Sequence, residues 1–375
     1  MTALAASMVL ASCDKNESDI NAPTDKSPKS VTIKLANLQK NVTSRSLNGN
    51  VTSEAAKLNN FTIFFVDGTG KFYEGYAAED ATKDTPLKRN YNAGEEIPTF
   101  HYLDASVTKV IVVGNPTWAE NAEPGNETVL EELTAAVADQ QNVESLVLVG
   151  EGPLTRNTQG ENEKVSGHTE AYKADVSILP LIARLEISAF EYSEDTDGDR
   201  DYTEIAISQV AVNNYYGTTT FANLTGSLVN QTIDEATIWP YLENLGAGWF
   251  NDKLTEGDVI TLNATNEYKH DMLAGVTTDN PTANVFAYNV PAGTAVPQVI
   301  VRLTGTKADN GTTPLYLATK NLLGAENKFQ AGYIYRMNAK SPFSFTDTDL
   351  GNPAKCVDVT VEVEPWQVVP VTPEF

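Results

Sequence analysis

Four aspartates at every second position form the one metal-like pattern of the chain: Asp195, Asp197, Asp199 and Asp201. Calcium loops present oxygen ligands at this spacing, with a glycine at the sixth position and a bidentate glutamate at the twelfth. Counted from Asp195, Gly198 is the fourth residue and Ala206 the twelfth. The pattern leaves a calcium site open as an alternative and favours a solvated acidic turn.

Other catalytic chemistry has little support. His101, His168 and His270 lie far apart, with no Cys or His at ligand spacing, so a zinc site is not indicated. We find no serine nucleophile elbow, no phosphate-binding glycine loop and no catalytic cysteine context. Carboxylate pairs are common in a chain with 50 Asp and Glu, so they are weak support for glycosidase chemistry. The sequence predicts a protein that is not an enzyme and has no cofactor.

Cys13 is the first candidate for covalent processing. It follows an apolar stretch that ends Leu10-Ala11-Ser12, and a lipoprotein signal peptidase cuts between such small residues and the cysteine, which leaves an acylated cysteine. The polar residues from Asp14 to Lys29 suit a tether. No Lys or Arg precedes the apolar run, and the alternative is an ordinary cysteine. We therefore expect residues 1–12 to be a signal-peptide remnant and Cys13 to carry lipid.

Arg45 is the second candidate, as a protease cleavage site before Ser46. Residues 41–50 are polar and include Gly49, and proteolysis concentrates in such exposed segments. The alternative is a surface arginine in a loop. Upstream, apolar residues alternate with polar ones as in a half-buried strand: Val31, Ile33 and Leu35. We predict that residues 13–45 form a lipidated propeptide with a removable strand.

Composition limits the partners. The 375 residues contain 26 Lys and Arg against 50 Asp and Glu, a net charge of -24, which repels nucleic acid and anionic membranes. After the N-terminus no run of about 18 apolar residues follows, so membrane attachment is expected only through lipid on Cys13. The two cysteines, Cys13 and Cys356, make no disulfide framework.

Strand patterns separated by turn signals dominate the rest of the chain. We expect strands at 61–66, 107–113, 203–212, 259–262, 296–304 and 333–338, and a hairpin through 67–70 to 71–73. The segment 181–189 has apolar residues at its odd-numbered positions and mostly other residues between them, which predicts a half-buried strand. One amphipathic helix is predicted between Glu127 and Gln140, packed on a sheet through Leu130, Leu133, Ala136 and Val137. The class is all-β, with two sandwiches over 46–180 and 181–375.

The C-terminus carries the clearest strand pattern. Valines alternate with polar residues at Val357, Val359, Val361 and Val363. After Trp366 the alternation resumes with Val369, Val371 and Phe375. An apolar terminus of this kind frays unless something pairs with it. For the first four valines an ordinary strand within the same domain is an open alternative, and Trp366 is interpreted as an anchor at a sandwich edge.

Several segments together resemble the fimbrillin family, the fimbrial subunits (type V pilins) of Bacteroidales. The resemblance lies in Leu10–Cys13, the strand before Arg45, Lys109–Asn115, Ala183–Ile187, Ala331–Met337 and Cys356–Trp366. It implies two transthyretin-like β-sandwich domains with a short helix in the first. It also implies an outer-membrane lipoprotein precursor, cut behind arginine by an arginine-specific protease and then assembled into an adhesive cell-surface fimbrium by donor-strand exchange with other fimbrial subunits.

The physics of sheets supports that implication. A sandwich that lacks a strand exposes unpaired backbone groups and an apolar trough, which together are a template for a strand from another chain. The rival hypothesis is a monomeric surface lipoprotein that binds a glycan or a host protein through exposed aromatic residues: Trp118, Trp239, Tyr241, Trp249 and Phe250. Deleting the terminal strand should abolish polymers under the first hypothesis and leave binding intact under the second.

Overall fold

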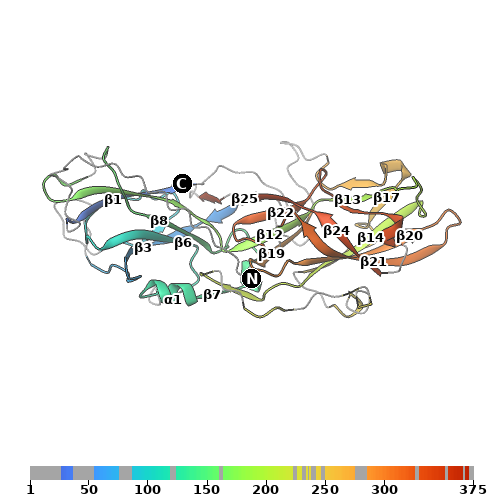
Figure 1. Cartoon of the computed structure of the whole chain (residues 1–375), viewed down its shortest axis with the longest axis horizontal. Helices are drawn as coiled ribbons and strands as arrows, with labels where there is room; N and C mark the ends of the chain where they lie inside the picture. Colours follow the sequence, from blue (N-terminus) through green and yellow to red (C-terminus); the bar gives the residue numbers. More distant parts are fainter. Residues whose placement is uncertain are drawn as a thin grey trace, which may run out of the picture.

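The chain is mainly β, as predicted, and forms an elongated molecule (Figure 1). The computed structural model describes residues 27–36, 55–75, 87–118, 124–159, 164–222, 226–229, 234, 236–237, 242–245, 250–274, 285–325, 329–350, 354–365 and 368–370. Strands β1, β3, β6 and β8 lie at one end of the molecule, and β14, β20 and β21 lie at the other. The bounds of the elements are given below.

Two sheets form the sandwich at the first end. One has the order β5-β1-β10-β9, with β5 Phe100–Leu103, β1 Lys29–Ala36, β10 Glu170–Ser177 and β9 Thr155–Arg156. The other has the order β11-β8-β6-β3-β4, with β11 Leu179–Pro180, β8 Leu148–Pro153, β6 Val107–Gly114, β3 Asn60–Asp67 and β4 Asn90–Asn92.

Alternation along β3 shows how this sandwich is filled. Phe61, Ile63 and Phe65 share a core with Val31 of β1, so they face the space between the two sheets. Phe64, on the opposite face, packs instead with Leu130 of helix α1 (Glu127–Glu132). Both faces of the strand are therefore covered, which accounts for its nearly continuous apolar sequence.

The second end is built from three further sheets around one core. A four-stranded sheet has the order β19-β12-β22-β25, with β19 Phe286–Pro291, β12 Ile182–Ile187, β22 Tyr333–Met337 and β25 Glu362–Pro365. A three-stranded sheet has the order β18-β13-β23, with β18 Lys269–Asp271, β13 Ala189–Tyr192 and β23 Phe343–Phe345. The largest sheet has the order β16-β14-β20-β21-β24, and β17 also pairs with β14. Its strands are β16 Asn251–Lys253, β14 Glu204–Asn213, β20 Gln298–Thr306, β21 Thr312–Leu323, β24 Ala354–Thr360 and β17 Ile260–Asn263.

Short elements complete the described part of the chain. Two small ladders join β15 (Thr218–Thr220) to β7 (Thr134–Ala136) and β26 (Val368–Pro370) to β2 (Ala56–Leu58). The 3-10 helices are η1 Val137–Gln140 and η3 Ala264–Asn266, and a last helical turn is α3 Asp347–Leu350.

The predicted helix from Glu127 to Gln140 is wrong in its length. Helix α1 begins at the cap Asn126, whose Oδ1 accepts the Val129 amide at 2.9 Å, and its last residue is Glu132. Residues 134–136 pair with β15 instead of continuing the helix, so tertiary pairing overrides local propensity. The predicted packing on a sheet is confirmed, because Leu130 lies with Phe64 in one cluster.

The segment from 181 to 189 also differs from its prediction as a half-buried strand. All six residues of β12 are buried, including Arg184 and Glu186 on the polar side of the alternation. The strand lies between β19 and β22, so it has no free edge, and the two charged side chains bind each other. The division at residues 180 and 181 stays a prediction, and Ile182 contributes its side chain to the first core.

Candidate strand-exchange site

Strand β1 occupies an interior position of its sheet. It pairs in parallel with β10 over its whole length, from Lys29 opposite Glu170 to Ala36 opposite Ser177. Its other edge pairs antiparallel with β5, where Lys29 faces Leu103 and Val31 faces Phe100. Removing β1 would therefore unpair the edges of two strands at once, β10 and β5.

The apolar side of β1 points into the first core. Val31 and Ile33 are buried, Leu35 is half-buried, and all three pack in the cluster that contains Phe100 and Val176. At about 1.5 to 3 kcal/mol for each fully buried aliphatic side chain, this strand contributes several kcal/mol to the folded state. The structure thus places the three predicted residues where a removable strand would be most stabilising.

Polar contacts that the sequence analysis did not predict hold the start of β1. The Lys29 ammonium donates to the Val107 carbonyl at 2.5 Å. The Ser30 hydroxyl lies 2.7 Å from His101 Nδ1 and 2.6 Å from the Thr169 hydroxyl. The partners lie 71 to 139 residues away in the chain, so no local pattern could have revealed them.

The processing residues themselves, Cys13, Arg45 and Ser46, lie outside the described residues, and their roles stay predictions. In the part of the chain that is described, no helix is long and apolar enough to cross a membrane.

The C-terminal valines fall into two groups. Val357, Val359 and Val361 are buried in the second core, and β24 pairs in parallel with β21. Val363 lies on β25, is 38% exposed, and faces Tyr335 across the antiparallel pair with β22. In this structure the first three valines are not a free strand, because they complete the core of their own chain.

The last described strand returns to the first sandwich. β26 pairs in parallel with β2 over three residues, with Val369 opposite Lys57. β2 in turn is fixed by its buried residues Ala56 and Leu58 and by a 3.0 Å hydrogen bond from the Lys57 amide to the Val143 carbonyl. A three-residue ladder is a weak attachment for the terminal segment. Trp366, Val371 and Phe375 lie outside the described residues.

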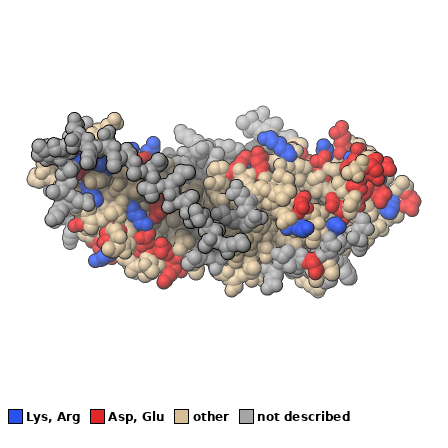
Figure 2. Space-filling view, viewed as in Figure 1, with Lys and Arg blue, Asp and Glu red and all other residues tan. Residues whose placement is uncertain are grey.

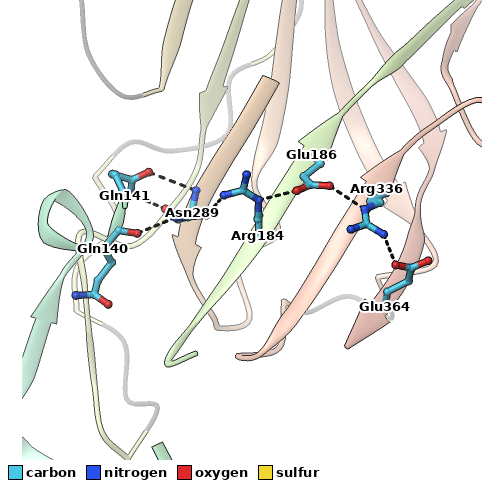
Figure 3. A network of polar contacts seen from close by, with 7 residues as sticks. All are labelled: Gln140, Gln141, Arg184, Glu186, Asn289, Arg336 and Glu364. Carbon is cyan, nitrogen blue, oxygen red and sulfur yellow. Dashed lines mark hydrogen bonds and ion pairs between the residues drawn. The ribbon is translucent and has the colours of Figure 1, made fainter. Parts of the chain in front are cut away.

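A buried polar network connects the first sandwich to the strand before this terminus (Figure 3). Asn289 donates to the Gln140 carbonyl at 2.9 Å, and its Oδ1 accepts from Arg184 at 2.9 Å. Arg184 donates to Glu186 at 2.6 Å, and Glu186 accepts from Arg336 at 2.8 Å. Arg336 also pairs with Glu364 of β25. The network therefore runs from η1 to the end of the second sandwich's four-stranded sheet.

Glu186 is the charged centre of that network. Burial alone would raise the pKa of this carboxyl, but the guanidinium groups of Arg184 and Arg336 outweigh burial and hold the pKa below its usual value. The side chain is therefore ionised at neutral pH, and its charge is balanced inside the protein.

The aspartates of the acidic turn accept hydrogen bonds from groups of the protein itself. The carboxylate of Asp195 accepts hydrogen bonds from the Thr348 amide at 3.0 Å and the Thr348 hydroxyl at 2.9 Å. Asp197 accepts from the Asp199 amide at 3.4 Å, and the Asp201 amide donates to Asp347. Among the residues that the structure describes, no group of three or more His, Cys, Asp or Glu side chains could hold a metal ion.

The aromatic residues of the rival hypothesis are only partly described. Trp118 is half-buried, with its ring centre 6.1 Å from that of Phe64. Phe250 packs at 4.3 Å from Tyr215 and is part of the second core's border. Trp239, Tyr241 and Trp249 lie outside the described residues. Of the two described residues of this set, Trp118 is the one that lies away from the second core.

The surface is acidic where the second sandwich ends. Figure 2 shows Asp and Glu side chains gathered over the end of the molecule that carries β13, β17 and β20, with fewer Lys and Arg among them. This distribution fits the net charge of -24.

Solved structures give the comparison that decides the fold. A candidate cell adhesion protein from Parabacteroides distasonis ATCC 8503 superposes with a TM-score of 0.50 at 12% identity, covering 93% of this chain and 99% of that one. The chain shares the fold of this adhesion protein. A fimbrilin from Porphyromonas gingivalis W83 matches with a TM-score of 0.43 at 12% identity, covering 92% of this chain and 99% of that one.

The resemblance to fimbrial proteins that the sequence suggested is confirmed at the level of the fold. The similar solved structures are fimbrial and candidate cell adhesion proteins from Porphyromonas, Bacteroides and Parabacteroides. No family model matches the chain, and no curated protein matches it. At these identities the likeness establishes the fold, and the function is argued separately.

Proposed function

We propose that this chain is a non-enzymatic fimbrial subunit, exported as an outer-membrane lipoprotein through Cys13 and cut after Arg45 by an arginine-specific protease. The released subunits then polymerise into a cell-surface fimbrium by strand exchange. One observation carries the proposal: β1, which precedes Arg45, is an interior strand whose Val31 and Ile33 fill the first core. Cleavage would detach that strand and leave a two-edged groove. The fold shared with an adhesion protein supports this proposal.

The incoming strand is assigned to the residues after Pro365. The segment from Val369 to Phe375 carries Val369, Val371 and, past Pro373, Phe375 at odd positions, as β1 carries Val31, Ile33 and Leu35. β26 is held by three residues of β2, so its release costs little. By contrast, donating Val357, Val359 and Val361 would open the second core, which is why we place the exchange beyond them.

Arginine-specific digestion of the purified precursor tests the proposal. We expect a new N-terminus at Ser46 and a ladder of multimers on a denaturing gel run without boiling. A variant in which Arg45 is replaced, Arg45→Ala, should stay uncut at this bond and monomeric. Absence of cleavage at Arg45 in the original chain would remove the main support for the proposal.

Deletion of residues 369–375 tests the donor. The truncated precursor should fold, lose its N-terminal segment on digestion, and form no multimers, because the acceptor groove is intact and the donor is missing. Multimers that form normally without these residues would overturn strand donation. The rival, a monomeric lipoprotein that binds a host protein or glycan, predicts that the deletion leaves ligand binding unchanged.

A further inference from the structure

A cavity of about 470 Å³ lies at the β4 edge of the five-stranded sheet in the first sandwich. Four polar residues line it, Asn60, Thr62, Asn90 and Asn92, together with Phe61 and Tyr91 of the same two strands and with Pro116 and Trp118 of the loop after β6. Neither the strand-exchange site nor the polar network uses the four polar side chains. The cavity therefore calls for a separate explanation.

Strand register gives the polar residues a regular arrangement. Asn60 is paired with Asn92, and Thr62 with Asn90. The pair between them, Phe61 and Tyr91, points inward, where the two rings stack at 5.5 Å in the first core. Because side chains alternate across a sheet, the four polar residues share the outer face as two adjacent cross-strand pairs.

This polar patch is held in place from within. The Thr62 hydroxyl donates to Asn90 Oδ1 at 2.7 Å, which fixes the orientation of that amide. Thr62 is buried, whereas Asn60 and Asn92 are exposed. The patch thus presents three amide groups at the β4 edge of the sheet, and Thr62 holds the amide of Asn90 in place.

Trp118 forms an aromatic wall beside the patch. Its ring centre lies 6.1 Å from Phe64 and 6.1 Å from Phe221, so packing on the outer face of the sheet restricts its movement. The half-buried indole also lines the cavity. The negative face of such a ring attracts C–H groups that carry partial positive charge.

Among the residues that the structure describes, no Lys, Arg, Asp or Glu lines this cavity, although 20% of the chain is charged. Arg89 precedes Asn90 but directs its guanidinium to the Phe64 ring, 5.9 Å from the ring centre. An uncharged lining gives no counter-ion for an anionic or cationic ligand. Amide groups both donate and accept hydrogen bonds, as the adjacent hydroxyls of a sugar also do.

We propose that this cavity binds a neutral glycan, with a sugar ring against Trp118 and its hydroxyls on Asn60, Asn90 and Asn92. The site lies on the outer face of the sheet, so it exists whether or not the chain polymerises. In a fibre it would be repeated in every subunit, and binding would gain strength by multivalency.

A glycan array probed with the full chain tests the proposal, with neutral hexose and N-acetylhexosamine oligosaccharides printed beside sialylated and sulfated ones. We expect binding to neutral glycans, followed by titration calorimetry with the best oligosaccharide. Asn92→Ala should weaken binding about tenfold, the loss of one or two hydrogen bonds. Trp118→Ala should weaken it at least about tenfold, and Trp118→Phe should weaken it less because a ring is kept.

Matched controls keep the test decisive. Asn321→Ala removes an exposed asparagine on the other sandwich, which bonds Asp358 at 2.7 Å, and should leave binding unchanged. Asn92 is exposed, so its substitution should spare the fold even if Trp118→Ala does not. No neutral glycan bound, binding only to sialylated or sulfated glycans, or equal affinity in Asn92→Ala and Asn321→Ala would each overturn the proposal.

Discussion

At the scale of single residues, charge is placed inside this protein only where a partner is fixed. Arg184 is fully buried and Glu186 is 3% exposed, in a chain whose other charges lie mostly on the surface. Two guanidinium groups face the one carboxylate, so removing that carboxylate leaves positive charge buried without a counter-ion. The cost of a broken buried pair exceeds what the intact pair contributes.

We therefore expect Glu186→Gln to lower the free energy of unfolding by about 3 to 5 kcal/mol, measured by urea denaturation at neutral pH. Glu191→Gln is the matched control, because Glu191 pairs with the exposed Lys269 at 2.9 Å and should cost about 0 to 1 kcal/mol. Equal losses in the two variants would show that the network is not stabilised by its charges.

Asp252 gives the protein a pH-dependent stability. Burial raises its pKa to about 6, although the 2.7 Å hydrogen bond from the Tyr288 hydroxyl opposes the shift. The folded protein thus binds this proton more tightly than the unfolded chain, with its ordinary value of 3.8. The contribution to stability is fully present below pH 3.8 and is lost as the pH rises through 6.

Asp252→Asn should remove that dependence. As the pH rises from 3.8 through about 6, the free energy of unfolding of the original chain should fall relative to that of the variant by up to about 3 kcal/mol. Urea denaturation of both proteins at half-unit pH steps measures the difference and cancels the other titrating groups. Parallel curves through the interval would exclude Asp252 as the source.

At the scale of elements, one short strand completes a core that the rest of the sandwich cannot close. β1 is eight residues long, yet it supplies pairing to two neighbours and apolar side chains to the cluster between the sheets. A strand with this position stabilises the fold, and under the proposed function its removal would leave a vacancy between β10 and β5.

Ile33→Ala should lower the free energy of unfolding of the uncut precursor by about 2 to 5 kcal/mol, because it leaves a cavity in the first core. Lys34→Ala, the exposed neighbour on the opposite face, should change it by less than about 0.5 kcal/mol. Both are measured by urea denaturation before cleavage. If the two variants were equally stable, β1 would not be part of the cooperative core.

At the scale of the whole molecule, the proposed assembly would have to overcome repulsion between like charges. Each chain carries a net charge of -24, and the acidic groups gather at one end in Figure 2. Two such subunits repel each other over about 30 Å at 0.01 M salt and over about 8 Å at 0.15 M.

Salt should therefore accelerate polymerisation of cleaved subunits. We expect about tenfold or faster formation of multimers when ionic strength rises from about 0.01 to 0.15 M, followed on gels run without boiling. Subunits fully cut beforehand separate this effect from protease kinetics. A rate that falls or stays constant with salt would show that encounter is not limited by charge.

Several strands follow from the sequence alone, because alternation needs only the two-residue period of an extended chain, whereas β10, β19 and β21 are not among the predicted strands. The patterns at 107–113, 203–212 and 333–338 became β6, β14 and β22, and 31–35 lies within β1. The cleavage and lipidation residues remain predictions from the sequence.

Tertiary structure alone decided which strand pairs with which, and which face is covered. Glu186 looked solvent-facing until β19 and β22 enclosed β12, and residues 134–136 left the predicted helix because β15 offered backbone partners. The neutral cavity at Trp118 likewise depends on the register of β3 and β4. Such contacts join residues far apart in the chain, and their energies depend on burial, which no local pattern encodes.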